Sequence, residues 1–194
     1  MTKRQKFYLP FKRLIDISGS MLGTFFCMAF FWWWVTIINL FVTKGHPFFV
    51  SKRVGKNGKE FGLVKFRSMK PDVDPNLTSM QSSEENLTRF GKFLRKTSID
   101  ETLQLFNIFI GQMAFIGPRP LINFDEDAIT IKKRKENGSI ALKPGLSGYA
   151  QMHKRASLDC ISKADYDFEY FKNFSFSLDT KIFIRTIFCL YYKK

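Results

Sequence analysis

The longest apolar stretch of the chain covers residues 17–42, which contain no charged side chain. A helix of this length can cross a hydrocarbon core of about 30 Å. The stretch is too long for a cleaved signal peptide, and no small-residue cleavage site follows it. The pattern therefore predicts a membrane helix that the protein retains.

Basic residues flank this stretch on both sides, which bears on whether it spans the membrane. The positive-inside tendency places both flanks in the cytoplasm, and one straight crossing cannot do so. A helix that turns back would do so, but the stretch contains no proline to bend it. Trp32-Trp33-Trp34 would lie near the far headgroups in a straight span. From these residues alone, the straight span is favoured. The flanking basic residues are Lys3, Arg4, Lys6, Lys12 and Arg13 before the stretch, and Lys44, Lys52, Arg53 and Lys56 after it.

Two further segments mix basic and aromatic residues. Residues 2–13 have a composition suited to an anionic headgroup surface. Residues 166–192 combine aromatic and apolar side chains with Lys172, Lys181 and Arg185. They predict an amphipathic helix that packs on the core or lies on the membrane.

Between these segments the pattern predicts mixed secondary structure. Asn57-Gly58 is a hairpin turn signal, with residues 47–50 before it and residues 61–66 as the returning strand. Residues 70–86 are polar and predict a long mobile loop. Helical spacing returns from Leu103 onward, and residues 124–136 predict a charged helix.

The charge and the cysteine and histidine content of the chain limit the classes of binding partner and metal site. The 194 residues carry a formal net charge of +14, which points to nucleic acid, an anionic membrane surface or a phosphorylated substrate. Cys27, Cys160 and Cys189 match no zinc or redox motif, so we expect a reducing compartment and no disulfide framework. His46 and His153 are the only histidines, a poor basis for a transition-metal site.

The stretch Ser98-Ile99-Asp100-Glu101 fits a capping box at the start of a helix. Two carboxylates would then lie at the positive end of the helix dipole, with Arg95 just upstream, and this setting keeps an aspartate ionised. Ionised carboxylates can cap a helix, bind a divalent cation or act as nucleophiles. For an isolated Asp-Glu pair after serine, capping is the usual role.

Two more segments have the residue types of a phosphate site. Arg119 lies between Pro118 and Pro120, so its guanidinium is presented from a stiff backbone. The glycine-punctuated segment Pro144-Gly145-Leu146-Ser147-Gly148 precedes Lys154 and Arg155, and free backbone N–H groups near cations suit an anion. A rigid turn with a solvated arginine, and an ordinary glycine turn, are the simpler interpretations.

Five motifs in this order resemble those of the bacterial sugar transferases, in particular the small monotopic phosphoglycosyl transferases. The resemblance covers nearly the whole chain; each motif alone is weak, and the five in order are specific. They are Lys12-Arg13-Leu14-Ile15-Asp16, Lys65-Phe66-Arg67-Ser68-Met69, the stretch from Ser98 to Asn107, Gly117-Pro118-Arg119-Pro120 and Pro144-Gly145-Leu146-Ser147-Gly148.

The resemblance implies a reaction and a set of roles. A UDP-sugar would donate a sugar-1-phosphate to polyprenyl phosphate and release UMP, through a covalent intermediate on Asp100. Glu101 would hold Mg²⁺. Such an enzyme initiates the assembly of a glycan. The phosphate contacts implied are Arg95, Arg119, Lys65, Arg67 and Arg155.

The resemblance also implies the architecture and location. The expected fold is α/β and mainly helical, with residues 1–45 forming the basic N-terminus and a re-entrant membrane helix. Residues 46–194 would form a compact cytoplasmic catalytic domain with a small β-hairpin and amphipathic interfacial helices. The protein would lie at the cytoplasmic face of the bacterial inner membrane, against anionic lipid, and homodimerisation is left open. This overturns the straight span favoured above.

The sequence departs from the family pattern at several positions. No Ser-Pro break lies in residues 17–42, so the position of the bend is open. Ser51, Gln112 and Tyr149 stand where Gln, Asp and Trp are common in the family. A non-catalytic membrane scaffold therefore stays an alternative. A membrane-anchored nucleic-acid binder, the other alternative, would leave the Asp-Glu pair without a role, and we expect no nucleic-acid partner.

Overall fold

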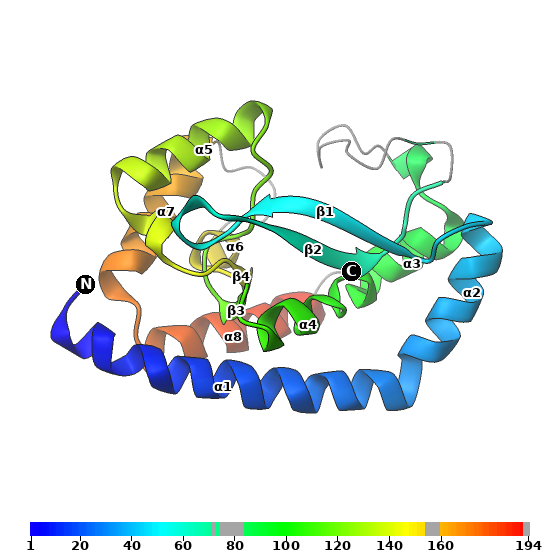
Figure 1. Ribbon diagram of the computed structural model, residues 1–194, viewed down its shortest axis with the longest axis horizontal. Coiled ribbons are helices and arrows are strands. Elements are labelled where there is room, and N and C mark those ends of the chain that lie inside the picture. The colour runs from blue at the N-terminus through cyan, green and yellow to red at the C-terminus, as the bar shows by residue number, and fades with distance from the viewer. Residues whose placement is uncertain (71–72, 74–83, 154–159, 192–194) are drawn as a thin grey trace. The chain divides into compact units, whose positions relative to one another are not determined.

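The computed structural model describes residues 1–70, 73, 84–153 and 160–191 (Figure 1). Its contacts divide the chain into two units, which are described separately. Unit 1 comprises residues 1–18, 52–61 and 108–194, and unit 2 comprises residues 19–51 and 62–107. The predicted loop at residues 70–86 lies mostly outside the described residues.

The apolar stretch forms two helices joined by a bend. Helix α1 (Lys3–Cys27) is followed by a π-helical segment at Met28–Trp32 and by α2 (Trp33–Thr43). Figure 1 shows that the chain bends at this segment, so that α2 runs in a different direction from the end of α1; both lie in unit 2. Wide π turns are a recognised cause of helix kinks, so no proline is needed here. The Trp34 indole N–H donates to the Phe30 carbonyl at 3.0 Å, which satisfies a backbone acceptor at the bend.

The length of this stretch fits a membrane segment. Among the described residues, Lys3–Thr43 is long and apolar enough to cross a membrane by length and composition. Only 22% of its most apolar window is buried inside the protein. A bent helix differs from the straight span that the residues alone favoured, and the reason is the π-helical segment, which has no sequence signature.

The hairpin is confirmed. Strands β1 (Phe48–Val54) and β2 (Glu60–Phe66) pair, and a 3₁₀ turn at Lys56–Gly58 connects them. Asn57 and Gly58 both adopt positive φ, 57° and 78°, as the turn signal requires. The Gly55 N–H donates to the Lys59 carbonyl at 2.8 Å and closes the loop.

The rest of unit 2 is helical. A 3₁₀ turn at Glu84–Asn86 precedes α3 (Arg89–Thr97), whose first turn is capped by Thr88 through a 2.8 Å bond from the Gly91 N–H. A second 3₁₀ turn at Ile99–Glu101 and the short α4 (Gln104–Phe109) follow.

Unit 1 is built on a parallel strand pair. Strands β3 (Ala114–Ile116) and β4 (Gly145–Ser147) align Ala114 with Gly145 and Ile116 with Ser147. A Cβ atom at Gly145 would lie 2.1 Å from the Gly117 backbone nitrogen, so only glycine permits this approach.

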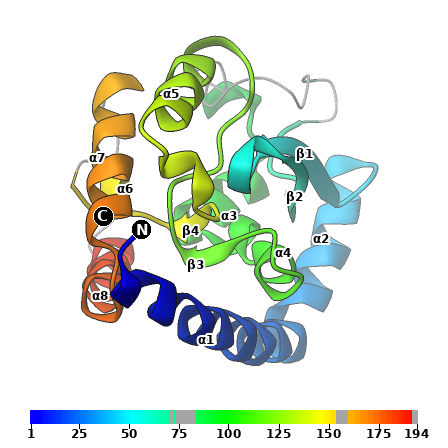
Figure 2. The same cartoon turned by 60° about the vertical axis from the view of Figure 1, so that its left-hand side comes forward.

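Helices surround this pair. They are α5 (Asp125–Glu136), α6 (Tyr149–His153), α7 (Cys160–Asn173) and α8 (Phe176–Tyr191), with a 3₁₀ turn at Ser139–Ala141. Figure 2 shows α5 beside α7, and these helices contact each other. The core of unit 1 contains Ile116, Leu142, Met152, Tyr170, Phe174 and Ile182.

The C-terminal segment predicted as one amphipathic helix is two helices, α7 and α8. The break follows Asn173, and the Ser175 hydroxyl accepts a hydrogen bond from the Leu178 N–H at 3.3 Å. Serine at this position caps a new helix start and so stops the helix from continuing. The predicted helix at residues 124–136 is confirmed as α5.

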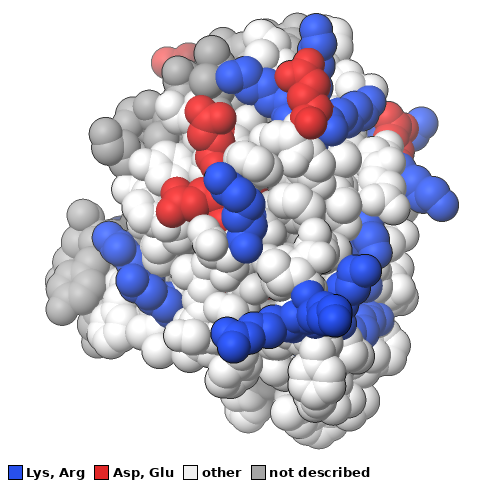
Figure 3. All heavy atoms as spheres, turned by 90° about the vertical axis from the view of Figure 1, so that its left-hand side faces the viewer, with Lys and Arg blue, Asp and Glu red and all other residues white. Residues whose placement is uncertain are grey.

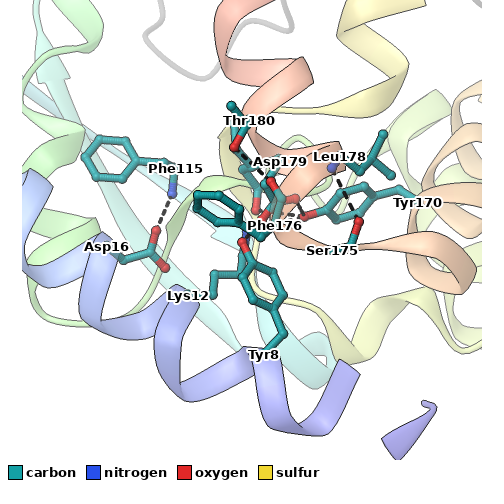
Figure 4. Close-up of polar contacts among 11 residues, drawn as sticks. Tyr8, Lys12, Asp16, Phe115, Tyr170, Ser175, Phe176, Leu178, Asp179 and Thr180 are labelled. Carbon is teal, nitrogen blue, oxygen red and sulfur yellow. Dashed lines mark hydrogen bonds and ion pairs between the residues drawn. The ribbon is translucent and has the colours of Figure 1, made fainter. Parts of the chain in front are cut away.

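The start of α1 is held on α7 and α8 by buried polar contacts (Figure 4). The Tyr8 and Tyr170 hydroxyls donate to Asp179 at 2.9 and 2.6 Å, and Lys12 forms an ion pair with the same carboxylate. The Gln5 amide caps the end of α7 through the Phe171 and Lys172 carbonyls. The opposite face of α1 stays apolar and exposed at Phe7, Phe11, Leu14 and Ile15.

Candidate active site

The Asp-Glu pair lies in a tight turn, not at a capped α-helix start. Ser98 ends α3 in the left-handed conformation, with φ 58°, and its side chain makes no cap hydrogen bond. Asp100 and Glu101 belong to the 3₁₀ turn, and α4 begins only at Gln104. The capping box is therefore wrong, because Ser98 is the C-cap of α3 rather than the N-cap of α4.

Asp100 is buried while Glu101 is half-buried. The Asp100 side chain is 7% exposed, and burial raises its pKa to about 6, with the adjacent Glu101 carboxylate adding to the effect. Lys65 and Arg95 act in the opposite direction and lower the pKa. The sequence predicted a setting that favours the ionised form of Asp100. Instead, burial raises the pKa by more than the positive charges lower it. With a pKa of about 6, most of the Asp100 carboxyl groups are still ionised at neutral pH.

Two predicted cations are thus brought to Asp100. Arg95, in the last turn of α3, donates from Nε to the Ser68 hydroxyl at 3.1 Å, which fixes its guanidinium. Lys65, on β2, places its ammonium 5.3 Å from the centre of the Phe49 ring. Arg67 lies one residue beyond β2, with its backbone bonded to Pro47 and to the Asn39 amide. This environment of cations can neutralise an incoming phosphate.

The turn has supports that the motifs did not reveal. The Trp32 indole N–H donates to the Thr102 hydroxyl at 2.9 Å, and the Trp32 ring lies 5.1 Å from that of Phe106. Asn107 is 2% exposed and bonds β2 twice, accepting from the Val64 N–H and donating to the Gly62 carbonyl. In a straight span Trp32 would lie near the far headgroups, but it is buried against the turn. Nothing in the run Trp32-Trp33-Trp34 indicates which tryptophan makes this contact.

Arg119 belongs to unit 1 and is presented as predicted. Pro118 and Pro120 are buried while Arg119 is exposed. Its backbone carbonyl accepts a 3.0 Å hydrogen bond from Arg134, whose guanidinium also pairs with buried Asp167 at 2.8 Å. Arg134 is thus a positioning residue that sequence reasoning missed, because α5 shows only a charged pattern. Arg155 lies outside the described residues.

The glycine segment is part of the sheet rather than an open anion loop. The Gly145 N–H donates to the Pro118 carbonyl at 2.9 Å, and the Ser147 carbonyl accepts from the Gly117 N–H. Its glycines therefore serve close backbone packing beside Arg119, and the Gly145 N–H is not free for an anion. Lys154 and Arg155, which belonged to the predicted anion site, lie outside the described residues.

Comparison with known sequences identifies the class of protein. The sequence model of the family described as bacterial sugar transferase matches residues 7–193. Because the match covers almost the whole chain, the protein belongs to the bacterial sugar transferases and is a transferase enzyme.

Curated relatives agree with this membership. The chain is 33% identical over 177 residues to the uncharacterized sugar transferase EpsL of Bacillus subtilis, covering 91% of this chain and 85% of that protein. It is 33% identical to the UDP-N-acetylgalactosamine-undecaprenyl-phosphate N-acetylgalactosaminephosphotransferase of Aeromonas hydrophila, over 93% of this chain and 43% of the relative. It is also 33% identical to the UDP-glucose:undecaprenyl-phosphate glucose-1-phosphate transferase of Klebsiella pneumoniae, over 93% of this chain and 40% of that protein. The chain thus spans less than half the length of these last two proteins.

Proposed function

We propose that the protein transfers a sugar-1-phosphate from a UDP-sugar to polyprenyl phosphate, with Asp100 as the covalent nucleophile. The observation that carries the proposal is the buried Asp100 carboxylate in a 3₁₀ turn, under the influence of Lys65 and Arg95. Relatives named for this type of reaction support it, as does the family match.

The reaction proceeds in two displacements. A carboxylate oxygen of Asp100 attacks the phosphorus nearest the sugar, the bond from that phosphorus to the bridging oxygen breaks, and UMP leaves. A phosphate oxygen of the polyprenyl acceptor then attacks the same phosphorus and releases Asp100. Lys65 and Arg95 reduce the electrostatic repulsion between the Asp100 carboxylate and the anionic donor. The proposal includes three further phosphate contacts, which are Arg67, Arg119 and Arg155.

Glu101 is the proposed Mg²⁺ ligand. Among the described residues, no group of three or more His, Cys, Asp or Glu side chains could enclose a metal. One or two carboxylates fit Mg²⁺ nevertheless, because this ion usually keeps waters and takes its other ligands from substrate phosphates. When bound, it would neutralise charge on the diphosphate. Glu101 is half-buried, so solvent and substrate can reach this position.

The surfaces of the helices support a membrane location for this chemistry. On α8 the side chains of Phe183, Ile184, Ile187 and Phe188 are about half exposed, as are the apolar residues on the outer face of α1. Figure 3 shows lysine and arginine side chains in a band across the face that carries the N-terminus. Exposed apolar helix faces with basic neighbours bind anionic lipid. We place the enzyme at the cytoplasmic face of the inner membrane, where a soluble donor meets a lipid acceptor.

The order of product release tests the proposal. Purified enzyme with Mg²⁺ and a panel of UDP-sugars, but no acceptor, should release at most one UMP per active site with the accepted donor. Adding polyprenyl phosphate should then start steady turnover. If no UMP forms with any donor until the acceptor is present, the two-step mechanism is wrong. The same panel identifies the sugar.

A further inference from the structure

Unit 1 contains a cavity of about 320 Å³ that no step of the proposed reaction uses. Its walls come from the start of α1, the hairpin turn, the segment around β3 and β4, and the end of α7. Four cationic side chains line it together with one carboxylate, while the remaining walls are largely apolar. The charged residues are Lys12, Arg13, Lys56, Lys143 and Asp16.

Two of these cations have protein partners. Lys12 forms an ion pair with Asp179. The Arg13 guanidinium donates to the Ile108 and Phe109 carbonyls at 2.7 Å each, which caps the end of α4, and its charge interacts favourably with the Asp16 carboxylate. Asp16 is 3% exposed and accepts from the Phe115 N–H at 3.0 Å (Figure 4).

The other two cations face like charges. Lys143 and Arg13 approach the same point, because a Cβ atom on Gly111 would lie 3.3 Å from Lys143 Nζ and 3.0 Å from Arg13 Nη2. Burial lowers the pKa of Lys143, and the positive charges of Arg13 and Lys56 lower it further, while the Asp16 carboxylate acts in the opposite direction without cancelling them. Among the described residues, neither Lys56 nor Lys143 forms an ion pair with a carboxylate. A cluster of this kind is stabilised when an anion enters it.

We propose that this cavity binds a phosphate group between Lys56, Lys143 and Arg13. Phosphate has enough acceptor oxygens for an ammonium on each side and a guanidinium edge. The apolar walls, which include Leu9, Leu142 and Phe174, leave room for a substituent on the phosphate. A phospholipid headgroup and a soluble phosphate compound both present this chemistry.

Site-resolved lysine acetylation tests the proposal on the full-length protein. In one arm, the protein in neutral detergent is acetylated with inorganic phosphate or with chloride at equal ionic strength. In the other, it is acetylated in phosphatidylglycerol or in phosphatidylcholine nanodiscs. Modification of each lysine is quantified by peptide mass spectrometry. A bound anion shields the amine and favours its protonated form. Lys143 should therefore be acetylated at least about threefold more slowly in phosphate than in chloride, or in phosphatidylglycerol than in phosphatidylcholine.

Lys59 is the internal control, since it lies in the same turn as Lys56 but does not line the cavity. Protection of Lys143 by inorganic phosphate would identify a soluble phosphate group as sufficient, and protection by phosphatidylglycerol alone would identify a lipid headgroup. The variant Lys56→Gln should reduce the protection, whereas Lys59→Gln should not. Equal reaction of Lys143 under all four conditions would overturn the proposal, and so would full protection in Lys56→Gln.

Discussion

The carboxyl group of Asp100 is buried at a thermodynamic cost to the fold. Its pKa is raised to about 6 from the ordinary value of 3.8, so the folded protein binds the proton more tightly than the unfolded chain. The penalty is absent below the unfolded pKa, grows as pH rises between the two values, and is complete above about pH 6. A nucleophilic role for Asp100, as proposed, would account for why the fold keeps a carboxylate at this destabilising position.

This cost predicts the behaviour of Asp100→Asn. At pH 7.5 the variant should be more stable than wild type by on the order of 2–3 kcal/mol, because the amide carries no charge to desolvate. At pH 4 the two should be nearly equal. Thermal or denaturant unfolding across this range measures the difference.

Asp165→Asn is the control, because Asp165 is exposed. It should change stability little at either pH. A stability difference between Asp100→Asn and wild type that is the same at pH 4 and pH 7.5 would contradict the burial argument.

For single residues, the sequence predicted which side chains belong to the candidate site better than it predicted their burial. The Asp-Glu pair, Arg95 and Lys65 could be singled out from their motifs, and the structure brings these four together. The burial of Asp100 could not be predicted, because Ser98-Ile99-Asp100-Glu101 fits a helix start and a 3₁₀ turn equally well. Only the left-handed conformation of Ser98 distinguishes them.

Among the elements, the bend at Met28–Trp32 is joined to the turn that contains Asp100 by a hydrogen bond from the Trp32 indole to the Thr102 hydroxyl. Thr102→Val removes the acceptor while keeping the shape of the side chain. It should cost about 1 kcal/mol of stability and slow turnover, because the turn that holds Asp100 loosens. Unfolding curves and initial rates measure both effects.

The matched variants are Thr102→Ser, which keeps the hydroxyl, and Trp32→Phe, which removes the donor. Thr102→Ser should behave nearly as wild type. Trp32→Phe combined with Thr102→Val should cost less than the sum of the single effects, since both break the same bond. Strict additivity would mean that the bond contributes nothing.

The buried Arg134–Asp167 pair joins α5 to α7 and holds the backbone at Arg119. Arg134→Met leaves Asp167 buried without a partner, so it should destabilise the protein by about 3 kcal/mol or more. The double variant Arg134→Met with Asp167→Leu should recover much of that loss, because no buried charge remains. Denaturant unfolding of the three proteins measures this, and a double variant no more stable than Arg134→Met would contradict it.

Elements with local markers were the ones that the sequence predicted. Asn57-Gly58 marked the hairpin, and the charged run marked α5. The bend between α1 and α2 had no marker, because a π-helical segment needs neither proline nor glycine. The break between α7 and α8 depends on Ser175, a residue that also occurs within helices.

In the intact protein, we expect both ends of the membrane helix to face the cytoplasm. The bend and the basic residues on both flanks support this topology. Single cysteines at Thr2 and Lys56, in a background without the three native cysteines, should both resist an impermeant thiol reagent in intact cells. Both should react after lysis. Labelling of Thr2→Cys from outside, with Lys56→Cys protected, would instead show a true span.

The mass of the protein itself can show whether Asp100 carries the sugar phosphate. Enzyme incubated with its UDP-sugar and Mg²⁺, without acceptor, should gain the mass of one sugar phosphate, located on the peptide that contains Asp100. The adduct should disappear when polyprenyl phosphate is added, and Asp100→Asn should never form it. If an adduct still accumulates in Asp100→Asn, or if an active wild-type enzyme forms none, Asp100 is not the nucleophile.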